Sequence, residues 1–218
     1  MRIASYIDHT ILKPFTPISE IERVCNEAAE YGFAAVCIPP PYVKRCKSIL
    51  SPTNVKVATV VGFPFGYSAI EAKVAESVLA LVDGADELDI VINLIALRNG
   101  DWDYLDKEIR LLLEIIHQKN KILKVIIESG VLSEQEIIKC CEIYGNAGVD
   151  FLKTSTGYAE KGASVTAVKL MREHLPASVM IKASGGIRSY DFASQLIAAG
   201  ADRLGCSSSV EIVKVSRE

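Results

Sequence analysis

Two lysines and one aspartate interrupt apolar runs of the sequence where buried strands are expected. Lys153 lies in DFLKTSTGY, Lys182 in VMIKASGG and Asp89 in ELDIVIN. Burial disfavours an ammonium ion and lowers the pKa of a lysine, and a second cation close by lowers it further. An uncharged amine can attack a carbonyl carbon and form a Schiff base, whose iminium withdraws electrons from the adjacent carbon–carbon bond. The pattern predicts Lys153 as the nucleophile, with Lys182 kept charged by Asp89 as the perturbing cation and proton relay.

A structural interpretation accounts for the same three residues. In it, Lys153 and Asp89 form a buried ion pair that stabilises the fold, and the ammonium group of Lys182 reaches solvent. The loops that follow the candidate strands favour chemistry instead, because TSTG, ASGG and GCSSS contain small, hydroxylated or glycine residues. Such loops expose backbone N–H groups, and a helix start behind them attracts anions, which is typical of a phosphate cradle in a barrel.

An internal repeat predicts the elements that position these residues. Four glycines, at positions 32, 84, 148 and 200, lie 52, 64 and 52 residues apart and are each followed by an apolar strand-like run. These spacings are about twice the roughly 30 residues of one strand-plus-helix unit. A further strand-like run lies in each gap, and a short one precedes the first helix. The eight predicted strand segments are YIDHT, YGFAAVCI, KVATVVGF, DGADELDIVI, LKVIIESG, AGVDFLKT, VMIKASGG and AGADRLGC.

Two of the intervening helices carry capping signals at their ends. A serine followed three residues later by glutamate fits a capping box, and a glycine at the other end supplies the left-handed conformation that stops a helix. The expected pairs and final glycines are Ser19 with Glu22 and Gly32, and Ser133 with Glu136 and Gly145.

Continuous Val, Ile and Leu strands that alternate with capped amphipathic helices are typical of a parallel sheet covered by helices. Eight such units predict a single α/β domain over residues 1–218, a (β/α)₈ TIM barrel with a short segment before the first long helix. An open doubly wound sheet is the alternative, but no G-x-G-x-x-G follows the first strand. Strand alternation lets three polar side chains point into the barrel while their neighbours face the helices: Asp89 beside Ile90, Lys153 beside Leu152, and Lys182 beside Ile181.

Composition narrows the possible partners. The chain has 218 residues, is 50% hydrophobic and carries a formal charge of −3, so it lacks the basic surface that nucleic acid binding requires. Asp8 and His9 interrupt the N-terminal segment, and no run approaches the roughly 20 apolar residues of a membrane span. We expect a cytoplasmic protein that does not bind membranes. The six cysteines form no C-x-x-C pair and the three histidines lie far apart in sequence, so we predict no metal site.

The sequence resembles the deoxyribose-phosphate aldolases, class I aldolases on a (β/α)₈ barrel, along nearly its whole length. The matching segments are IDHTILKP, VCIPP, VVGFPFG, ADELDIVIN, LKVIIESG, DFLKTSTGY, IKASGGIR and GADRLGCSSS. The resemblance implies that Lys153 forms the Schiff base and that Lys182 and Asp89 are the second lysine and the proton-relay aspartate. It also implies that the substrate phosphate is bound by Thr156, Gly185, Gly186, Ser207 and Ser208.

The implied reaction is the reversible cleavage of 2-deoxy-D-ribose 5-phosphate to D-glyceraldehyde 3-phosphate and acetaldehyde, in deoxyribonucleotide catabolism and without a cofactor. The resemblance also implies an inner polar network that includes Asp8 and Lys124. Two features depart from the pattern of some members: Tyr158 follows STG in place of a lysine, with Lys161 nearby but not aligned, and the chain ends in VSRE rather than in a tail with a terminal tyrosine.

Two other functions stay open at this point. Related barrels share the lysine and the phosphate loops, so the substrate could be another phosphorylated sugar or keto compound. A catalytically silent barrel that binds a sugar phosphate would carry the same loops. Barrels of this kind commonly pair, and we expect a homodimer or homotetramer.

Overall fold

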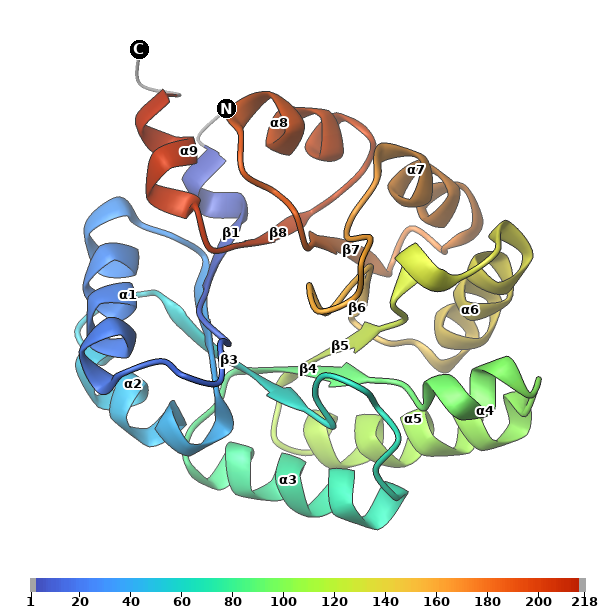
Figure 1. Ribbon diagram of the computed structural model, residues 1–218. Helices are drawn as coiled ribbons and strands as arrows, with labels where there is room; N and C mark the ends of the chain where they lie inside the picture. Colours follow the sequence, from blue (N-terminus) through green and yellow to red (C-terminus); the bar gives the residue numbers. More distant parts are fainter. Residues whose placement is uncertain (1–2, 216–218) are drawn as a thin grey trace.

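Eight parallel strands close into a barrel in a computed structural model that describes residues 3–215. Neighbouring strands pair in chain order, and β8 pairs with β1. Figure 1 looks down this barrel, and the helices surround it. The closed sheet confirms the (β/α)₈ prediction and rules out the open doubly wound alternative. The strands are β1 (Ile7–Thr10), β2 (Ala35–Ile38), β3 (Lys56–Val61), β4 (Glu87–Val91), β5 (Ile122–Ile126), β6 (Phe151–Lys153), β7 (Met180–Ser184) and β8 (Arg203–Cys206).

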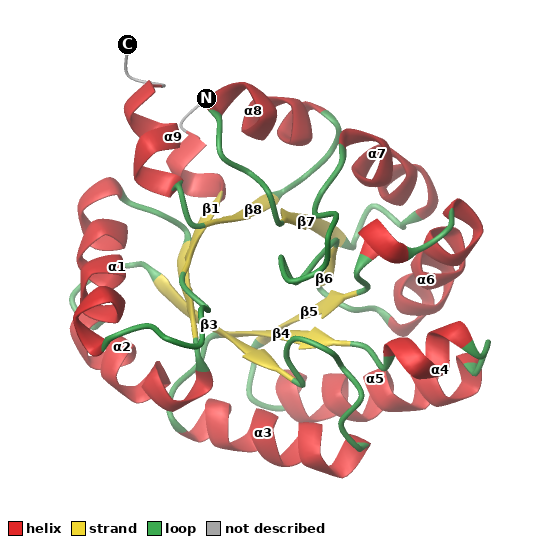
Figure 2. Cartoon of the chain, in the orientation of Figure 1, coloured by secondary structure: helices red, strands yellow, loops and turns green. Residues whose placement is uncertain are grey.

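At least one helix follows every strand, and Figure 2 shows these helices outside the ring of strands. None of the helices within residues 3–215 has the length and apolar character needed to cross a membrane. The α-helices are α1 (Ile18–Tyr31), α2 (Val43–Leu50), α3 (Ile70–Val82), α4 (Leu94–Arg98), α5 (Trp102–His117), α6 (Glu134–Ala147), α7 (Val165–His174), α8 (Tyr190–Ala198) and α9 (Ser209–Val215). Short 3₁₀ helices are η1 (Ile3–Tyr6), η2 (Pro40–Tyr42) and η3 (Ser129–Val131).

The main hydrophobic core lies between the strands and the helices. Ile90, Leu152 and Ile181 are fully buried in it, as strand alternation predicts. The opposite faces of β2 and β3 form a second, smaller apolar cluster from Ala35, Cys37, Ala58 and Val60. Because Ala35 is in register with Asp8 and Val60 with Asp89, this cluster faces the barrel interior on the same side as the charged residues.

Helix α1 begins differently from the prediction. Its N-cap is Pro17, in an extended conformation, so the helix starts one residue before Ser19 and no side chain caps it. The Ser19–Glu22 capping box is therefore wrong, and the Glu22 carboxylate accepts a hydrogen bond from Arg45 Nε at 2.9 Å instead. The other end agrees with the prediction, because Gly32 ends the helix with a φ of 69°.

At helix α6 the predicted capping box is confirmed, and the predicted final glycine is wrong. The Ser133 hydroxyl accepts from the Glu136 N–H at 3.3 Å, and the Glu136 carboxylate accepts from the Ser133 N–H at 2.7 Å, which completes the predicted capping box. Gly145 does not end the helix, which continues to a left-handed Gly148 with a φ of 76°. Gly145 instead serves packing, since a Cβ at this position would lie 2.8 Å from Pro176 Cδ.

Candidate active site

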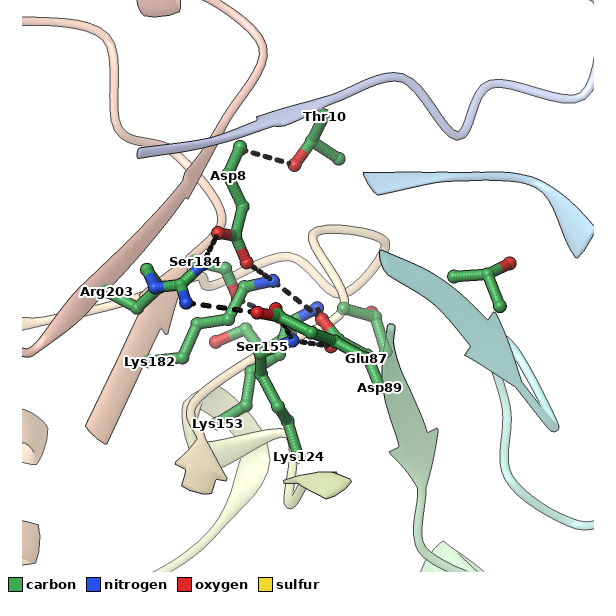
Figure 3. Close-up of polar contacts among 12 residues, drawn as sticks. Asp8, Thr10, Glu87, Asp89, Lys124, Lys153, Ser155, Lys182, Ser184 and Arg203 are labelled. Carbon is green, nitrogen blue, oxygen red and sulfur yellow. Dashed lines mark hydrogen bonds and ion pairs between the residues drawn. The ribbon is translucent and has the colours of Figure 1, made fainter. Parts of the chain in front are cut away.

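The carboxylate of Asp89 lies at the centre of a charged cluster inside the barrel (Figure 3). Its Oδ2 atom accepts hydrogen bonds from Lys153 Nζ at 2.8 Å and from Lys182 Nζ at 2.7 Å. Its Oδ1 atom accepts from Lys124 Nζ at 2.8 Å. Strand register explains the convergence, because Lys153 on β6 is aligned with Lys182 on β7, and Asp89 on β4 is aligned with Lys124 on β5.

A second layer of ion pairs supports the first. The Asp8 carboxylate accepts hydrogen bonds from both Lys182 and Arg203. Glu87 lies 2.6 Å from Lys124 Nζ and 3.1 Å from the Arg203 guanidinium. This arrangement confirms that Asp8 and Lys124 belong to an inner polar network. Lys182 is fully buried, so the interpretation in which its ammonium reaches solvent is wrong.

The cluster has one more cation than it has carboxylates, so its formal charge is +1 when every group is ionised. Such an excess is unfavourable where water cannot screen it, because burial penalises uncompensated charge. The cluster becomes neutral if one lysine loses its proton. The seven members are Asp8, Glu87 and Asp89 with Lys124, Lys153, Lys182 and Arg203.

The surroundings of each lysine shift its pKa in a different direction. Burial lowers the pKa of Lys153, and the Lys182 ammonium adds to this against the opposing attraction of Asp89. Burial acts in the same direction on Lys182, but Asp8 and Asp89 outweigh it and raise the pKa of Lys182. Burial alone would raise the pKa of Asp89, yet Lys124, Lys153 and Lys182 hold it well below its usual range. Lys153 is therefore the lysine of this cluster whose pKa is lowered, whereas the pKa values of Lys124 and Lys182 are raised.

A cavity of about 770 Å³ opens at the carboxyl ends of the strands. Of the seven cluster members, Lys153 is the one that lines it, so the amine with the lowered pKa is also the one within reach of a ligand. The cavity walls come from residues at and after the ends of β1, β6, β7 and β8. Five predicted site residues line the cavity: Lys153, Thr156, Gly185, Gly186 and Ser207.

The other predicted site residues lie outside the lining of the cavity. Lys182 and Asp89 are fully buried behind Lys153. Ser208 is half-buried before α9, where its carbonyl accepts from Ile212 N at 3.1 Å, and it is not brought to the cavity surface.

Two glycines give the β7–α8 loop its shape. Gly185 and Gly186 have φ values of 88° and 79°, a region that strains any residue with a Cβ. The β6–α7 loop approaches this turn closely, since a Cβ on Gly162 would lie only 2.3 Å from the Gly185 carbonyl oxygen. The two loops form one wall of the cavity in direct backbone contact.

An aromatic residue follows STG in this chain and ties two loops together. The Tyr158 hydroxyl donates to the Leu12 carbonyl at 2.9 Å, and the Tyr158 ring meets Phe63 edge to face at 5.4 Å between centroids. Tyr158 lines the cavity, whereas the exposed Lys161 does not. Other cationic side chains line the same cavity, namely Lys13, Arg23 and Arg188.

Three charged residues of the site were not predicted from the sequence: Glu87, Arg203 and Glu128. Glu87 shares the inward face of β4 with Asp89, two residues away, so strand alternation contains the signal for it. Glu128 is buried beside the β6–α7 loop and accepts hydrogen bonds from Thr156. No local pattern of the sequence indicates that contact.

His9 is a hydrogen-bonded buried residue. Its ring nitrogens contact Ser209 Oγ at 2.9 Å and Glu27 Oε2 at 2.7 Å. Cys37 and Cys206 are likewise buried as packed small side chains, and all six cysteines are free. Among residues 3–215, no three His, Cys, Asp or Glu side chains gather in a group that would hold a metal ion. The last three residues of VSRE lie outside the described part of the chain, so the comparison of this end with a tail that ends in tyrosine concerns residues that the structure does not describe.

Comparison with known proteins identifies the family. Residues 2–210 match the family described as DeoC/LacD family aldolase. The deoxyribose-phosphate aldolase of Thermococcus gammatolerans is 50% identical over 219 residues, covering 100% of this chain and 97% of that protein. A solved aldolase called QR15 is 40% identical with a TM-score of 0.93, covering 99% of this chain and 96% of that one. The tetrameric deoxyribose phosphate aldolase of Aeropyrum pernix is 30% identical with a TM-score of 0.92, covering 99% and 91%. The chain belongs to the DeoC/LacD family of aldolases.

Proposed function

We propose that this chain is a cytoplasmic deoxyribose-phosphate aldolase that reversibly cleaves 2-deoxy-D-ribose 5-phosphate to D-glyceraldehyde 3-phosphate and acetaldehyde. Its place is in deoxyribonucleotide breakdown, and it uses neither a cofactor nor nucleic acid. The observation that carries the proposal is the Lys153 amine, which has a lowered pKa and lines the cavity above a charged cluster. The aldolase activity of the similar proteins supports the same conclusion.

The first half of the reaction builds an electron sink on the lysine. The neutral Lys153 amine attacks the C1 aldehyde of the open-chain sugar, and the resulting carbinolamine loses water to form an iminium. The departing hydroxide needs a proton, and the charged Lys182 ammonium on Asp89 Oδ2, next to Lys153, is the nearest store of protons in the cluster. The iminium performs the electron withdrawal that a Lewis acid would otherwise supply.

The second half breaks the carbon–carbon bond. Removal of the C3 hydroxyl proton lets the C2–C3 bonding electrons move into the iminium, which frees glyceraldehyde 3-phosphate and leaves an enamine on Lys153. Protonation of the enamine at C2 and addition of water then release acetaldehyde and regenerate the amine. Acid–base help from the Asp89–Lys182 pair would contribute about 10²–10⁴-fold to the rate.

One wall of the cavity is suited to a phosphate group. Gly185 and Gly186 form a turn with positive φ angles, and Ser207 lies just before the start of α9. We assign phosphate binding to this wall, together with Thr156 and Ser208 on the loops that form and support it. Binding the phosphate contributes by orientation, because it holds C1 near the amine without acting on the reacting bonds.

Trapping of the Schiff base tests the proposal. Incubation with acetaldehyde and borohydride should add the mass of a reduced two-carbon adduct to the peptide that contains Lys153, and Lys153→Ala should remove both the adduct and turnover while phosphate affinity stays largely intact. Turnover of deoxyribose 5-phosphate should be compared with turnover of a panel of longer ketose phosphates. Slower turnover of the ketose phosphates would establish deoxyribose 5-phosphate as the substrate. Turnover that survives in Lys153→Ala would falsify the assignment, and an unmodified protein that binds the sugar phosphate would be a silent binder.

We further propose that the chain forms a homodimer or a homotetramer. Three large apolar side chains are exposed on α3, namely Val78, Leu79 and Val82, the last at 78%. Exposed apolar side chains in a continuous stripe are typical of surfaces that associate, and the similar Aeropyrum pernix enzyme is tetrameric. Light scattering of the chain should give a multiple of the protomer mass, and Val82→Asp should reduce it if α3 forms the interface.

A further inference from the structure

Glu128 combines two unfavourable features at one residue. Its backbone is left-handed, with φ 55° and ψ 53°, a conformation that is sterically unfavourable for a residue with a Cβ. Its carboxyl side chain is also buried, with 3% exposure, although a buried carboxylate is disfavoured unless it is hydrogen-bonded. Glycine or asparagine would meet the backbone requirement at a lower cost. The side chain must therefore contribute something that these residues cannot.

The carboxylate of Glu128 accepts hydrogen bonds from both the backbone N–H and the hydroxyl of Thr156, a residue of the β6–α7 loop. The Thr156 backbone N–H contacts its two oxygens at 3.2 and 3.3 Å, and the Thr156 hydroxyl donates to Oε2. The same hydroxyl oxygen accepts from the Tyr158 N–H at 3.0 Å. One carboxylate thus fixes a chain of contacts along Thr156, Gly157 and Tyr158, all of which line the cavity.

The backbone on either side of Glu128 is attached to the strand that carries the nucleophile. The Ile127 N–H donates to the Lys153 carbonyl at 3.1 Å, and the Ser129 N–H donates to the Thr154 carbonyl at 2.7 Å. The left-handed residue between these two bonds directs its side chain to the loop while its neighbours continue the pairing of β5 with β6. The segment 127–129 therefore contacts both the β6–α7 loop and the backbone of Lys153.

We propose that Glu128 is a positioning residue that holds the β6–α7 loop in the shape that binds the substrate phosphate, at a set distance from Lys153. This inference rests on the proposed function. Glu128 does not line the cavity, so it acts through Thr156 and not by contact with the sugar. The two donors of Thr156 point at Glu128, so the contribution of Thr156 to phosphate binding is to orient Gly157 and Tyr158.

The variant Glu128→Gln tests this role with little change in size. Glutamine keeps the left-handed backbone but removes the negative charge and replaces one accepting oxygen with an NH₂ group that only donates. The Thr156 N–H, which now contacts both oxygens, would face that NH₂ group, and the remaining oxygen would accept as a neutral group. We expect KM for deoxyribose 5-phosphate to rise about tenfold, as for loss of a hydrogen bond to a charged group, with little change in kcat. Cleavage of 2-deoxyribose, which has no phosphate, should keep its kcat/KM. Glu160→Gln, at an exposed carboxylate of the same loop, is the matched control and should leave both substrates unchanged.

A double-mutant cycle adds a readout that a merely structural role would not move. Thr156→Val removes the hydroxyl from the same contact, so its KM effect and that of Glu128→Gln should not multiply in the double variant. Thr156→Val alone should show the same split between substrates, which keeps the test valid if Glu128→Gln does not fold. Equal losses on both substrates, or multiplicative effects in the cycle, would overturn the role of Glu128. Failure of the wild-type chain to cleave either sugar would instead overturn the proposed function.

Discussion

Replacing Lys182 with methionine tests the electrostatic origin of the lowered Lys153 pKa. The amines of Lys153 and Lys182 contact the same Asp89 Oδ2 atom at 2.8 and 2.7 Å, so they lie no more than 5.5 Å apart, the sum of the two distances. At an effective dielectric constant of about 20, two unit charges at this separation repel by about 3 kcal/mol. Lys182→Met removes this repulsion and leaves Asp89 Oδ2 to Lys153 alone.

Both consequences of Lys182→Met favour the protonated form of Lys153 and raise the pKa of its amine. The neutral fraction near neutral pH should fall roughly 100-fold, since every 1.36 kcal/mol is a factor of about ten. The rate of adduct formation on Lys153 with acetaldehyde and cyanoborohydride, followed by mass spectrometry across pH, measures that fraction. The acidic limb of the profile should move to higher pH, and the two rates should converge at alkaline pH, where both amines are neutral.

The alkaline end of the profile also separates ionisation from proton relay. A rate deficit that stays constant at every pH would mean that Lys182 acts on the chemistry and not on the charge of Lys153, and the electrostatic reasoning would be refuted. Lys161→Met, at an exposed lysine off the cavity, should leave the profile unchanged. Breaking a buried ion pair costs about 3–5 kcal/mol, so circular dichroism must show that Lys182→Met is folded under the assay conditions.

Two further predictions concern the loops and the helix ends. Gly162→Ala should raise KM for deoxyribose 5-phosphate, because the new Cβ would lie 2.3 Å from the Gly185 carbonyl oxygen and must displace the β7–α8 loop. A Cβ at Gly148 meets no atom within 4 Å, but the φ of this residue is 76°, so Gly148→Ala should lower the unfolding temperature and leave KM unchanged. Ser133→Ala should lower the free energy of unfolding in urea by about 1 kcal/mol through loss of a cap, whereas Ser19→Ala should have almost no effect, because α1 has no side-chain cap. Equal KM effects of the two glycine variants, or equal costs of the two serine variants, would contradict these assignments.

The strands, two of the four predicted helix ends and the inward direction of the polar side chains could be predicted from the sequence. These features depend on short-range rules: alternation along a strand, the Ser133–Glu136 cap, and a left-handed glycine such as Gly32. The same rules failed at Ser19, where Pro17 starts the helix early, and at Gly145, where contact with a neighbouring segment and not a helix end requires the glycine. A local pattern cannot tell which of two suitable residues the packing will use.

Which charged residues meet depends on contacts between segments that lie far apart in the sequence. Lys153 contacts Asp89 across 64 positions of sequence, and Lys182 contacts Asp8 across 174. The closure and register of the barrel bring these residues together, and with them Glu87, Arg203 and the excess positive charge. The lowered pKa of Lys153 follows from that sum, because the free energy of a buried charge depends on every charge around it and not on its neighbours in the chain.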